Sequence, residues 1–384
     1  MEVKPMNIGV IGTGMISGKY LDTLRNKFTI LKLAAVADMN PAAANAAAER
    51  YHVKAVTVDE LLADESIDVV LNLTPPTVHC EMLKRILLAG KHAYTEKTFT
   101  MNTREAKELM ELAEEKHLYI GSAPDTFFAS WVQNARAVID SGRLGTITSF
   151  AMIGNRDNER LLSAMAYLSR PGGGIIQDYV VYYLTVLINL LGPVRSVSAR
   201  VKAPYPTHVN IFKPSPIYGQ VFDTPNESQI YSVLEMENGV TGTLCINADS
   251  VFFDQTYFAI YGNKGILYLG CPDWFEGEIS IYENTDDFED AANPRRIKIE
   301  DPYPFKTDSR GVGVADMAWA IREGRESRVS KERCYHVLEI EEKMVESSEK
   351  NGAFCDVEST CTRSLPLSIP ADTEESSLSS VEVS

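Results

Sequence analysis

Two glycines near the N-terminus follow an apolar run and open a helical stretch. Gly12 allows a tight turn, and Gly14 lets the backbone come close to a bound pyrophosphate. The unpaired N–H groups and the positive dipole end of the helix then attract the phosphates. Ser17 stands where this dinucleotide fingerprint usually has a third glycine, so a turn without a ligand is the alternative. The loop residues expected to contact the cofactor are Gly12, Thr13, Gly14, Met15 and Ile16.

A carboxylate, Asp38, follows the second apolar run, roughly twenty residues beyond the glycine loop. It can accept hydrogen bonds from the adenosine ribose hydroxyls and would repel the 2′-phosphate of NADP. Met39 and Asn40 supply no arginine to neutralise that phosphate. We therefore expect NAD and regard NADP as disfavoured. The alternative is that Asp38 only caps the helix beginning at Pro41.

Thr74, Pro75 and Pro76 close the fourth apolar run. In an open α/β sheet, loops at the carboxyl ends of the strands line the ligand crevice, so we expect these residues beside the cofactor. The prolines end the strand because they cannot continue a hydrogen-bonded ladder. His79, at the start of the next helix, either touches the cofactor or packs inside the protein, and both roles stay open.

Two further groups of polar residues have spacings that suit chemistry on a bound molecule. Glu96 and Lys97 close the fifth apolar run, although such a pair alone is typical of a surface ion pair. Asp178 and Tyr182 follow three glycines at 172–174, and their spacing of four residues puts both on one helical face. A phenol with a pKa near ~10 is a poor base at neutral pH. An aromatic helix face packed into the core is the alternative for Tyr182.

Together these motifs resemble the glucose–fructose oxidoreductase, inositol dehydrogenase and rhizopine-catabolism (Gfo/Idh/MocA) family. The resemblance covers nearly the whole chain, to about Pro366. Thr98 stands where the family has a proline that often carries a cis bond, and Tyr182 replaces the family's usual histidine. The segments that carry the resemblance are Gly12-Thr13-Gly14, Thr74-Pro75-Pro76, Glu96-Lys97-Thr98, 139–145, 172–174, 261–265 and 311–316.

The resemblance implies roles for four of these residues. Lys97 is the proton-handling residue beside the nicotinamide, where a partly desolvated amine near a cationic ring has a lowered pKa and can act as a base. Glu96 orients Lys97 or contacts the nicotinamide ribose. Asp178 is the substrate-binding carboxylate, and Tyr182 is a helper or substrate anchor.

Further polar residues are candidates for hydrogen bonds to substrate hydroxyls, because the second domain of this fold turns them toward the crevice. Taken singly, each is more typical of a protein surface. These candidates are Asp125, Arg156, Asn158, Arg160 and Tyr167.

The order of apolar runs predicts two domains. Strand-like and helical stretches alternate over residues 7–125, which predicts a doubly wound parallel sheet of the Rossmann type. Longer β-rich segments follow, interrupted by an apolar helix near Asp178–Leu191, and predict an α+β domain with a large open, mainly antiparallel sheet. We expect a cofactor domain over 1–125 and a substrate-binding and oligomerisation domain over 126–363. Residues 364–384, rich in Ser and Glu, predict an arm or a disordered tail.

Composition narrows the class of partner. A net charge of −16 argues against nucleic acid, which needs clustered Lys and Arg. No stretch approaches the ~20 apolar residues of a membrane span, and no signal-peptide pattern begins the chain, so we expect a cytoplasmic protein without a membrane partner. The scattered cysteines predict no metal site. A homo-oligomer, a dimer or tetramer, is expected because the open sheet would otherwise leave an apolar face exposed.

The function expected from these features is NAD-dependent oxidation of a secondary hydroxyl on a sugar, a glycoside (at C3 in the favoured version) or a cyclitol. One alternative is a redox-assisted lyase or glycosidase that keeps its NAD tightly bound. The other is a non-catalytic NAD(H)-binding regulator, which the missing histidine makes conceivable.

Overall fold

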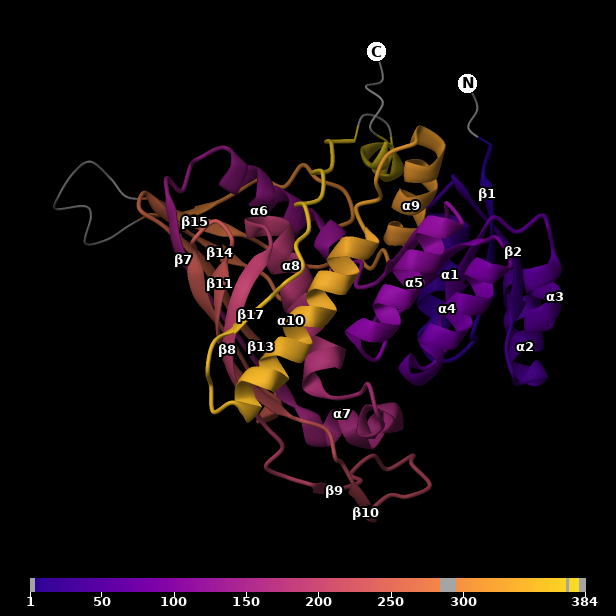
Figure 1. Cartoon of the computed structure of the whole chain (residues 1–384), viewed down its shortest axis with the longest axis horizontal. Helices are drawn as coiled ribbons and strands as arrows, with labels where there is room; N and C mark the ends of the chain where they lie inside the picture. The colour runs from indigo at the N-terminus through magenta and orange to yellow at the C-terminus, as the bar shows by residue number, and fades with distance from the viewer. Residues whose placement is uncertain (1–3, 284–294, 371–372, 380–384) are drawn as a thin grey trace. The chain divides into compact units, whose positions relative to one another are not determined.

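The computed structural model describes residues 4–283, 295–370 and 373–379, and divides into two compact units (Figure 1). Unit 1 holds the chain up to Ala129, and unit 2 begins at Ser130. Two later segments return to unit 1, namely Tyr303–Tyr335 and the described residues from Ser364 on. The expected domains 1–125 and 126–363 are each one continuous stretch, whereas each of these units combines separate segments of the chain.

Unit 1 contains a six-stranded parallel sheet with the strand order β3-β2-β1-β4-β5-β6. This confirms the doubly wound sheet, and the central strand β4 is buried at every position as a strand covered on both faces should be. The strands are β1 (Met6–Ile11), β2 (Leu31–Ala37), β3 (Lys54–Ala55), β4 (Val69–Asn72), β5 (His92–Thr95) and β6 (Ile120–Ser122). The helices between them are α1 (Ser17–Asn26), α2 (Pro41–Tyr51), α3 (Val58–Ala63), α4 (His79–Leu88) and α5 (Thr103–Glu115).

The third strand lies earlier than its apolar residues suggest. The sequence predicts a strand at 56–58, whereas β3 ends at Ala55. Thr57 instead caps α3, where its side chain accepts a hydrogen bond from the Glu60 N–H and the Glu60 carboxylate accepts one from the Thr57 N–H. Because of this capping box, Val58 is the first residue of a helix and not part of a strand.

Over the described residues 364–370 and 373–379, the C-terminal segment forms an arm on unit 1. Arg328 donates to the carbonyl oxygens of Leu365 and Pro366 at 2.8 and 3.1 Å. Its guanidinium also pairs with Asp316 at 2.5 Å, within helix α9 (Val312–Glu323). The short helix η6 (Glu374–Leu378) follows on the same arm.

Unit 2 is built on a nine-stranded sheet with the order β16-β15-β14-β13-β7-β12-β11-β8-β17. Only the β12–β7 pairing in this sheet is parallel among the described residues, so the mainly antiparallel expectation is confirmed. Its strands are β7 (Ile147–Asp157), β8 (Val194–Lys202), β11 (Gln229–Met236), β12 (Thr241–Asn247), β13 (Asp249–Gly262), β14 (Gly265–Leu269), β15 (Ser280–Glu283), β16 (Arg295–Lys298) and β17 (Cys355–Asp356). A separate hairpin pairs β9 (Thr207–Val209) with β10 (Val221–Asp223).

Helices cover one face of this sheet, as Figure 1 shows for α6, α8 and α10. The α8 helix is buried at every position, which explains its mostly apolar sequence. The chain enters α8 through a π-helical turn over Ile176–Val180, where the sequence predicts a regular helix. The helices of unit 2 are α6 (Ser130–Asp140), α7 (Asn158–Ala164), α8 (Val181–Leu191) and α10 (Lys331–Glu349), which belongs to unit 2 from His336 on.

Candidate functional site

The glycine loop has the geometry of an anion cradle. Gly12 has φ +99°, and a Cβ there would lie 2.7 Å from the carbonyl group of Leu73, so only glycine fits. A Cβ on Gly14 would meet nothing within 4 Å, which leaves open space beside its backbone. Within the described chain, the N–H groups of Gly14, Met15 and Ile16 have no hydrogen-bond acceptor. The loop therefore offers three N–H donors next to open space, as a pyrophosphate requires.

Asp38 is tied to this loop. Its Oδ2 accepts hydrogen bonds from the N–H and the hydroxyl of Thr13 at 2.7 and 2.9 Å. Its Oδ1 accepts one from the Asn40 N–H at 2.8 Å. Partial burial acts to raise the pKa of Asp38, but the donors from Asn40 and Thr13 outweigh it and lower the pKa. The carboxylate is thus ionised and fixed at the carboxyl end of β2, where a ribose hydroxyl could donate to it. The helix at Pro41 is capped by Asn40, not by Asp38.

The loop after β4 is organised by a buried amide. Asn72 Oδ1 accepts a hydrogen bond from the Thr74 hydroxyl at 2.8 Å, and Asn72 Nδ2 donates to the Thr95 hydroxyl at 3.1 Å. This joins the ends of β4 and β5. Pro75 then turns the chain into a short helix that begins at Pro76. Since β1, β4 and β5 are parallel neighbours, the loops after them share one edge of the sheet.

His79 is fully buried between two loops of that edge. Its Nδ1 lies 2.7 Å from the carbonyl oxygen of Thr98, and its Nε2 lies 2.8 Å from that of Thr74. Burial lowers the pKa of His79, and a neutral ring can donate to only one of these carbonyls at a time. The geometry accounts for both ring nitrogens with main-chain contacts, so it supports the packing role. A cofactor contact by His79 stays a prediction.

The Glu96-Lys97-Thr98 loop follows β5. Glu96 Oε1 accepts a hydrogen bond from the hydroxyl of Tyr20 at 2.7 Å, and Oε2 accepts one from the Lys97 N–H at 3.0 Å. Tyr20 is fully buried in α1, so Glu96 joins the helix of the glycine loop to the lysine loop. Lys97 itself is half-buried. The Lys97–Thr98 peptide bond is cis although threonine replaces the expected proline.

Asp125, expected to bind substrate, is only 2% exposed, and its carboxylate is hydrogen-bonded inside unit 1. A substrate contact by Asp125 stays a prediction. Oδ1 accepts a hydrogen bond from the Tyr94 hydroxyl, and Oδ2 accepts one from the Gly311 N–H at 2.5 Å, at the start of α9. Burial raises the pKa of Asp125 to about 6. Its role is to anchor α9, which the sequence could not show because Gly311 lies far along the chain.

In unit 2, Asp178 lies in the π-helical turn and is 7% exposed. Arg156, from the end of β7, approaches it with Nη1 3.5 Å from Asp178 Oδ2, and its Nη2 lies 3.8 Å from Asp273 Oδ2. The guanidinium also stacks on the ring of Tyr179 at 4.0 Å. Burial acts to lower the pKa of Arg156, but Asp273 and Asp178 raise it overall. Arg156 is therefore a fixed cation held between the Asp178 and Asp273 carboxylates.

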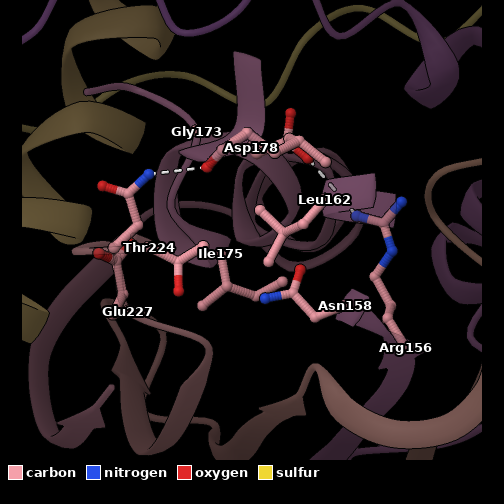
Figure 2. Close-up of a pocket in the computed structure, with 10 residues that line it drawn as sticks. Arg156, Asn158, Leu162, Gly173, Ile175, Asp178, Thr224 and Glu227 are labelled. Carbon is pink, nitrogen blue, oxygen red and sulfur yellow. Dashed lines mark hydrogen bonds and ion pairs between the residues drawn. The ribbon is translucent and has the colours of Figure 1, made fainter. Parts of the chain in front are cut away.

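A small polar pocket opens beside this pair, as Figure 2 shows. It brings together two residues expected at the substrate site, Arg156 and Asp178, with the candidate Asn158. Glu227 also lines it, although no motif marks this residue in the sequence. The remaining lining residues are Leu162, Leu168, Gly173, Ile175, Thr224 and Asn226.

The other expected substrate residues lie elsewhere in unit 2. Tyr167 is 43% exposed and does not line the pocket. Arg160 is also exposed and pairs with Asp157 at 2.9 Å. Tyr182, 8% exposed, lies at the start of α8 and is not part of the pocket lining. Its assignment as a helper or substrate anchor stays a prediction.

The described residues contain no group of three or more His, Cys, Asp and Glu side chains arranged to hold a metal ion. None of the helices over these residues has both the length and the apolar character needed to cross a bilayer.

Both units match models of one protein family. Residues 6–123 match the model described as "Oxidoreductase family, NAD-binding Rossmann fold". Residues 132–268 match the GFO/IDH/MocA C-terminal domain. The residues present fit this cofactor, since the open glycine loop and the fixed Asp38 carboxylate are what a dinucleotide needs.

Individual relatives and solved structures agree with this match. An uncharacterised oxidoreductase of Schizosaccharomyces pombe is 34% identical over 205 residues, which cover 52% of this chain and 55% of that protein, so the match spans about half of each. An inositol 2-dehydrogenase of Corynebacterium glutamicum is 26% identical over 294 residues, covering 74% of this chain and 80% of its own length. The structure of a levoglucosan dehydrogenase in complex with NADH superposes with a TM-score of 0.79 at 19% identity, covering 93% of this chain and 100% of that one. At this identity the structural likeness shows the shared fold.

Proposed function

The chain belongs to the GFO/IDH/MocA family of NAD-binding oxidoreductases, and from this premise we propose that it oxidises a secondary hydroxyl of a small polyhydroxylated compound. The observation that carries the proposal is the edge of the unit 1 sheet, where the glycine loop after β1 and the lysine loop after β5 lie one strand apart. The Tyr20–Glu96 hydrogen bond joins the two. Relatives named inositol 2-dehydrogenase and D-xylose dehydrogenase support a sugar, glycoside or cyclitol as substrate.

The proposal gives each residue a distinct task. Bound NAD would supply the hydride acceptor. Lys97 accepts the proton that the substrate hydroxyl loses, as a general base positioned beside the reacting group. Asp178, paired with Arg156, accepts hydrogen bonds from substrate hydroxyls. Tyr182 acts as a helper or anchor, and C3 of a pyranoside is the favoured position of oxidation.

We further propose a homo-oligomer formed through the outer face of the nine-stranded sheet. A row of side chains runs across four neighbouring strands on that face, because Tyr231 pairs with Cys245, Cys245 with Ile153, and Ile153 with Tyr257. Three of the four are large and about 40% exposed, with values of 42% for Tyr231, 41% for Ile153 and 39% for Tyr257. Contiguous exposed apolar surface of this kind favours association.

The test is a screen of the purified protein against sugars, glycosides and inositols, with cofactor fluorescence as the readout and product analysis of each hit. A keto product formed with net reduction of NAD supports the proposal. Release of an aglycone without net NADH would indicate the redox-assisted lyase instead. If no compound changes the cofactor fluorescence and the Lys97→Ala variant keeps the protein's biological function, the protein is instead a non-catalytic NAD(H)-binding regulator.

A further inference from the structure

The pocket of unit 2 carries more negative than positive charge. Its one guanidinium, Arg156, is already shared between Asp178 and Asp273. Glu227 adds a second carboxylate to the lining, on the other side of the pocket from Arg156 in Figure 2. An anionic substrate would therefore meet carboxylates here, whereas a neutral molecule with several hydroxyls would meet acceptors for its hydrogen bonds.

Glu227 is held in place by the glycine-rich turn. Its Oε1 accepts a hydrogen bond from the Ile176 N–H at 3.1 Å, and its main-chain oxygen accepts one from the Ile175 N–H at 3.0 Å. The carboxylate lies against Gly174, where a Cβ would come within 2.5 Å of both oxygens. Glycine at 174 thus makes room for the carboxylate. These contacts fix Glu227 at the start of the turn that carries Asp178.

The second carboxylate oxygen of Glu227 is available to a ligand. No other residue in the described part of the chain donates a hydrogen bond to Oε2. The neighbouring amide of Asn226 is occupied, because its Nδ2 donates to the carbonyl oxygens of Leu168 and Arg170 at 2.8 and 2.7 Å. Burial raises the pKa of Glu227, whereas its own N–H and that of Ile176 lower it. A substrate hydroxyl would supply Oε2 with a donor from a second molecule.

We propose that Glu227 is a specificity-determining residue that accepts a hydrogen bond from a substrate hydroxyl, and that with Asp178 it selects neutral polyols over phosphorylated or carboxylated sugars. This inference rests on the proposed dehydrogenase function. It assigns Glu227 to substrate recognition rather than to proton transfer, since Lys97 already has that task.

The test compares kcat/KM of wild type and Glu227→Gln for matched pairs of substrates, such as a neutral sugar and its 6-phosphate or uronic acid. Glutamine keeps an oxygen for the Ile176 N–H but removes the negative charge and one acceptor. We expect kcat/KM for the neutral substrate to fall about tenfold. The ratio of kcat/KM for the neutral substrate to kcat/KM for the anionic substrate should fall by more than this factor. Glu159→Gln is the matched control, because Glu159 is an exposed carboxylate on α7, the helix that supplies Asn158.

The outcomes separate this inference from the function on which it rests. If wild type oxidises none of the substrates, the proposed function fails. If wild type is active but Glu227→Gln and Glu159→Gln have the same neutral-to-anionic ratio as wild type, Glu227 is only a cap of the turn and the inference is overturned. A wild type that prefers anionic substrates would also overturn it. A changed ratio in Glu227→Gln alone, with an unchanged thermal midpoint, supports it.

Discussion

At the scale of single residues, Asp38 both orders the glycine loop and is the expected acceptor that distinguishes NAD from NADP. Its carboxylate holds Thr13 and Asn40 in place and is the expected acceptor for a ribose hydroxyl. Asp38→Asn removes the charge with little change of shape, so we expect NAD affinity to fall about tenfold, as for lost charge-assisted hydrogen bonds. The preference for NAD over NADP should shrink, because the repulsion of a 2′-phosphate disappears. Fluorescence titration with both cofactors measures this, and Asp22→Asn on the surface of α1 is the control. An unchanged preference would exclude a discriminating role for Asp38.

Sequence spacing located the residues of unit 1 better than those of unit 2. The glycine loop, Asp38 and the Glu96-Lys97 pair each follow a parallel strand, and parallel strands end at one edge of a sheet. The sequence does not mark Glu227, which lines the pocket, or Asp273, which pairs with Arg156, because both come from loops far along the chain from Asp178 and belong to no motif. The sequence also could not show that Asp125 is buried, because its partners Tyr94 and Gly311 lie far from it along the chain.

At the scale of elements, the C-terminal arm acts as a clamp. Glu375 accepts hydrogen bonds from the N–H and hydroxyl of Thr29 at 2.8 and 2.6 Å, and from the Ile30 N–H at 2.9 Å, at the start of β2. It is only 5% exposed. The composition of this segment suggested an arm or a tail, and the sequence could not reveal which because the partners of Glu375 lie more than 300 residues away.

Removing this clamp should destabilise unit 1. Glu375→Ala leaves the buried Ile30 N–H and the partly buried Thr29 N–H without their acceptor, so we expect a loss of about 2 kcal/mol in the free energy of unfolding. Urea unfolding followed by circular dichroism measures the change. Glu65→Ala, which removes an exposed carboxylate, is the control. Equal unfolding midpoints for the two variants would show that the arm contributes nothing to stability.

At the scale of the whole molecule, a buried histidine makes stability depend on pH. His336 Nε2 accepts a hydrogen bond from the Val194 N–H at 3.0 Å, which requires an unprotonated nitrogen. Burial lowers the pKa of His336 to about 4, from 6.5 for an ordinary histidine. Between pH 4 and pH 6.5 the unfolded chain binds a proton that the folded chain does not. The contribution of neutral His336 to the free energy of unfolding is therefore fully present above pH 6.5 and is lost as the pH falls.

The loss should reach about 3 kcal/mol at pH 4. Glutamine does not titrate and can offer an oxygen to the Val194 N–H. The His336→Gln variant should therefore lose less stability than wild type between pH 7 and pH 4, which urea unfolding at a series of pH values measures. Parallel stability curves for the two proteins would contradict the assignment of a neutral, buried ring.

Association through the open sheet is a second property at this scale. Ile153 lies in the middle of the exposed row, between Cys245 and Tyr257. We expect Ile153→Glu to convert the oligomer to a monomer, because a charge cannot be buried there without a partner. Light scattering after size-exclusion chromatography measures the mass. The control is Val251→Glu, which changes an exposed apolar residue of β13 outside this row. A monomeric wild type would contradict the proposed interface.

A single-turnover measurement directly tests the proposed proton transfer by Lys97. Enzyme with bound NAD is mixed with an active polyol, and hydride transfer is followed by the near-ultraviolet absorbance of the reduced nicotinamide. The account predicts that Lys97→Ala binds NAD as wild type does but transfers hydride at least about 100-fold more slowly, whereas Lys107→Ala, an exposed lysine on α5, behaves as wild type. Hydride transfer at the wild-type rate in Lys97→Ala would contradict it.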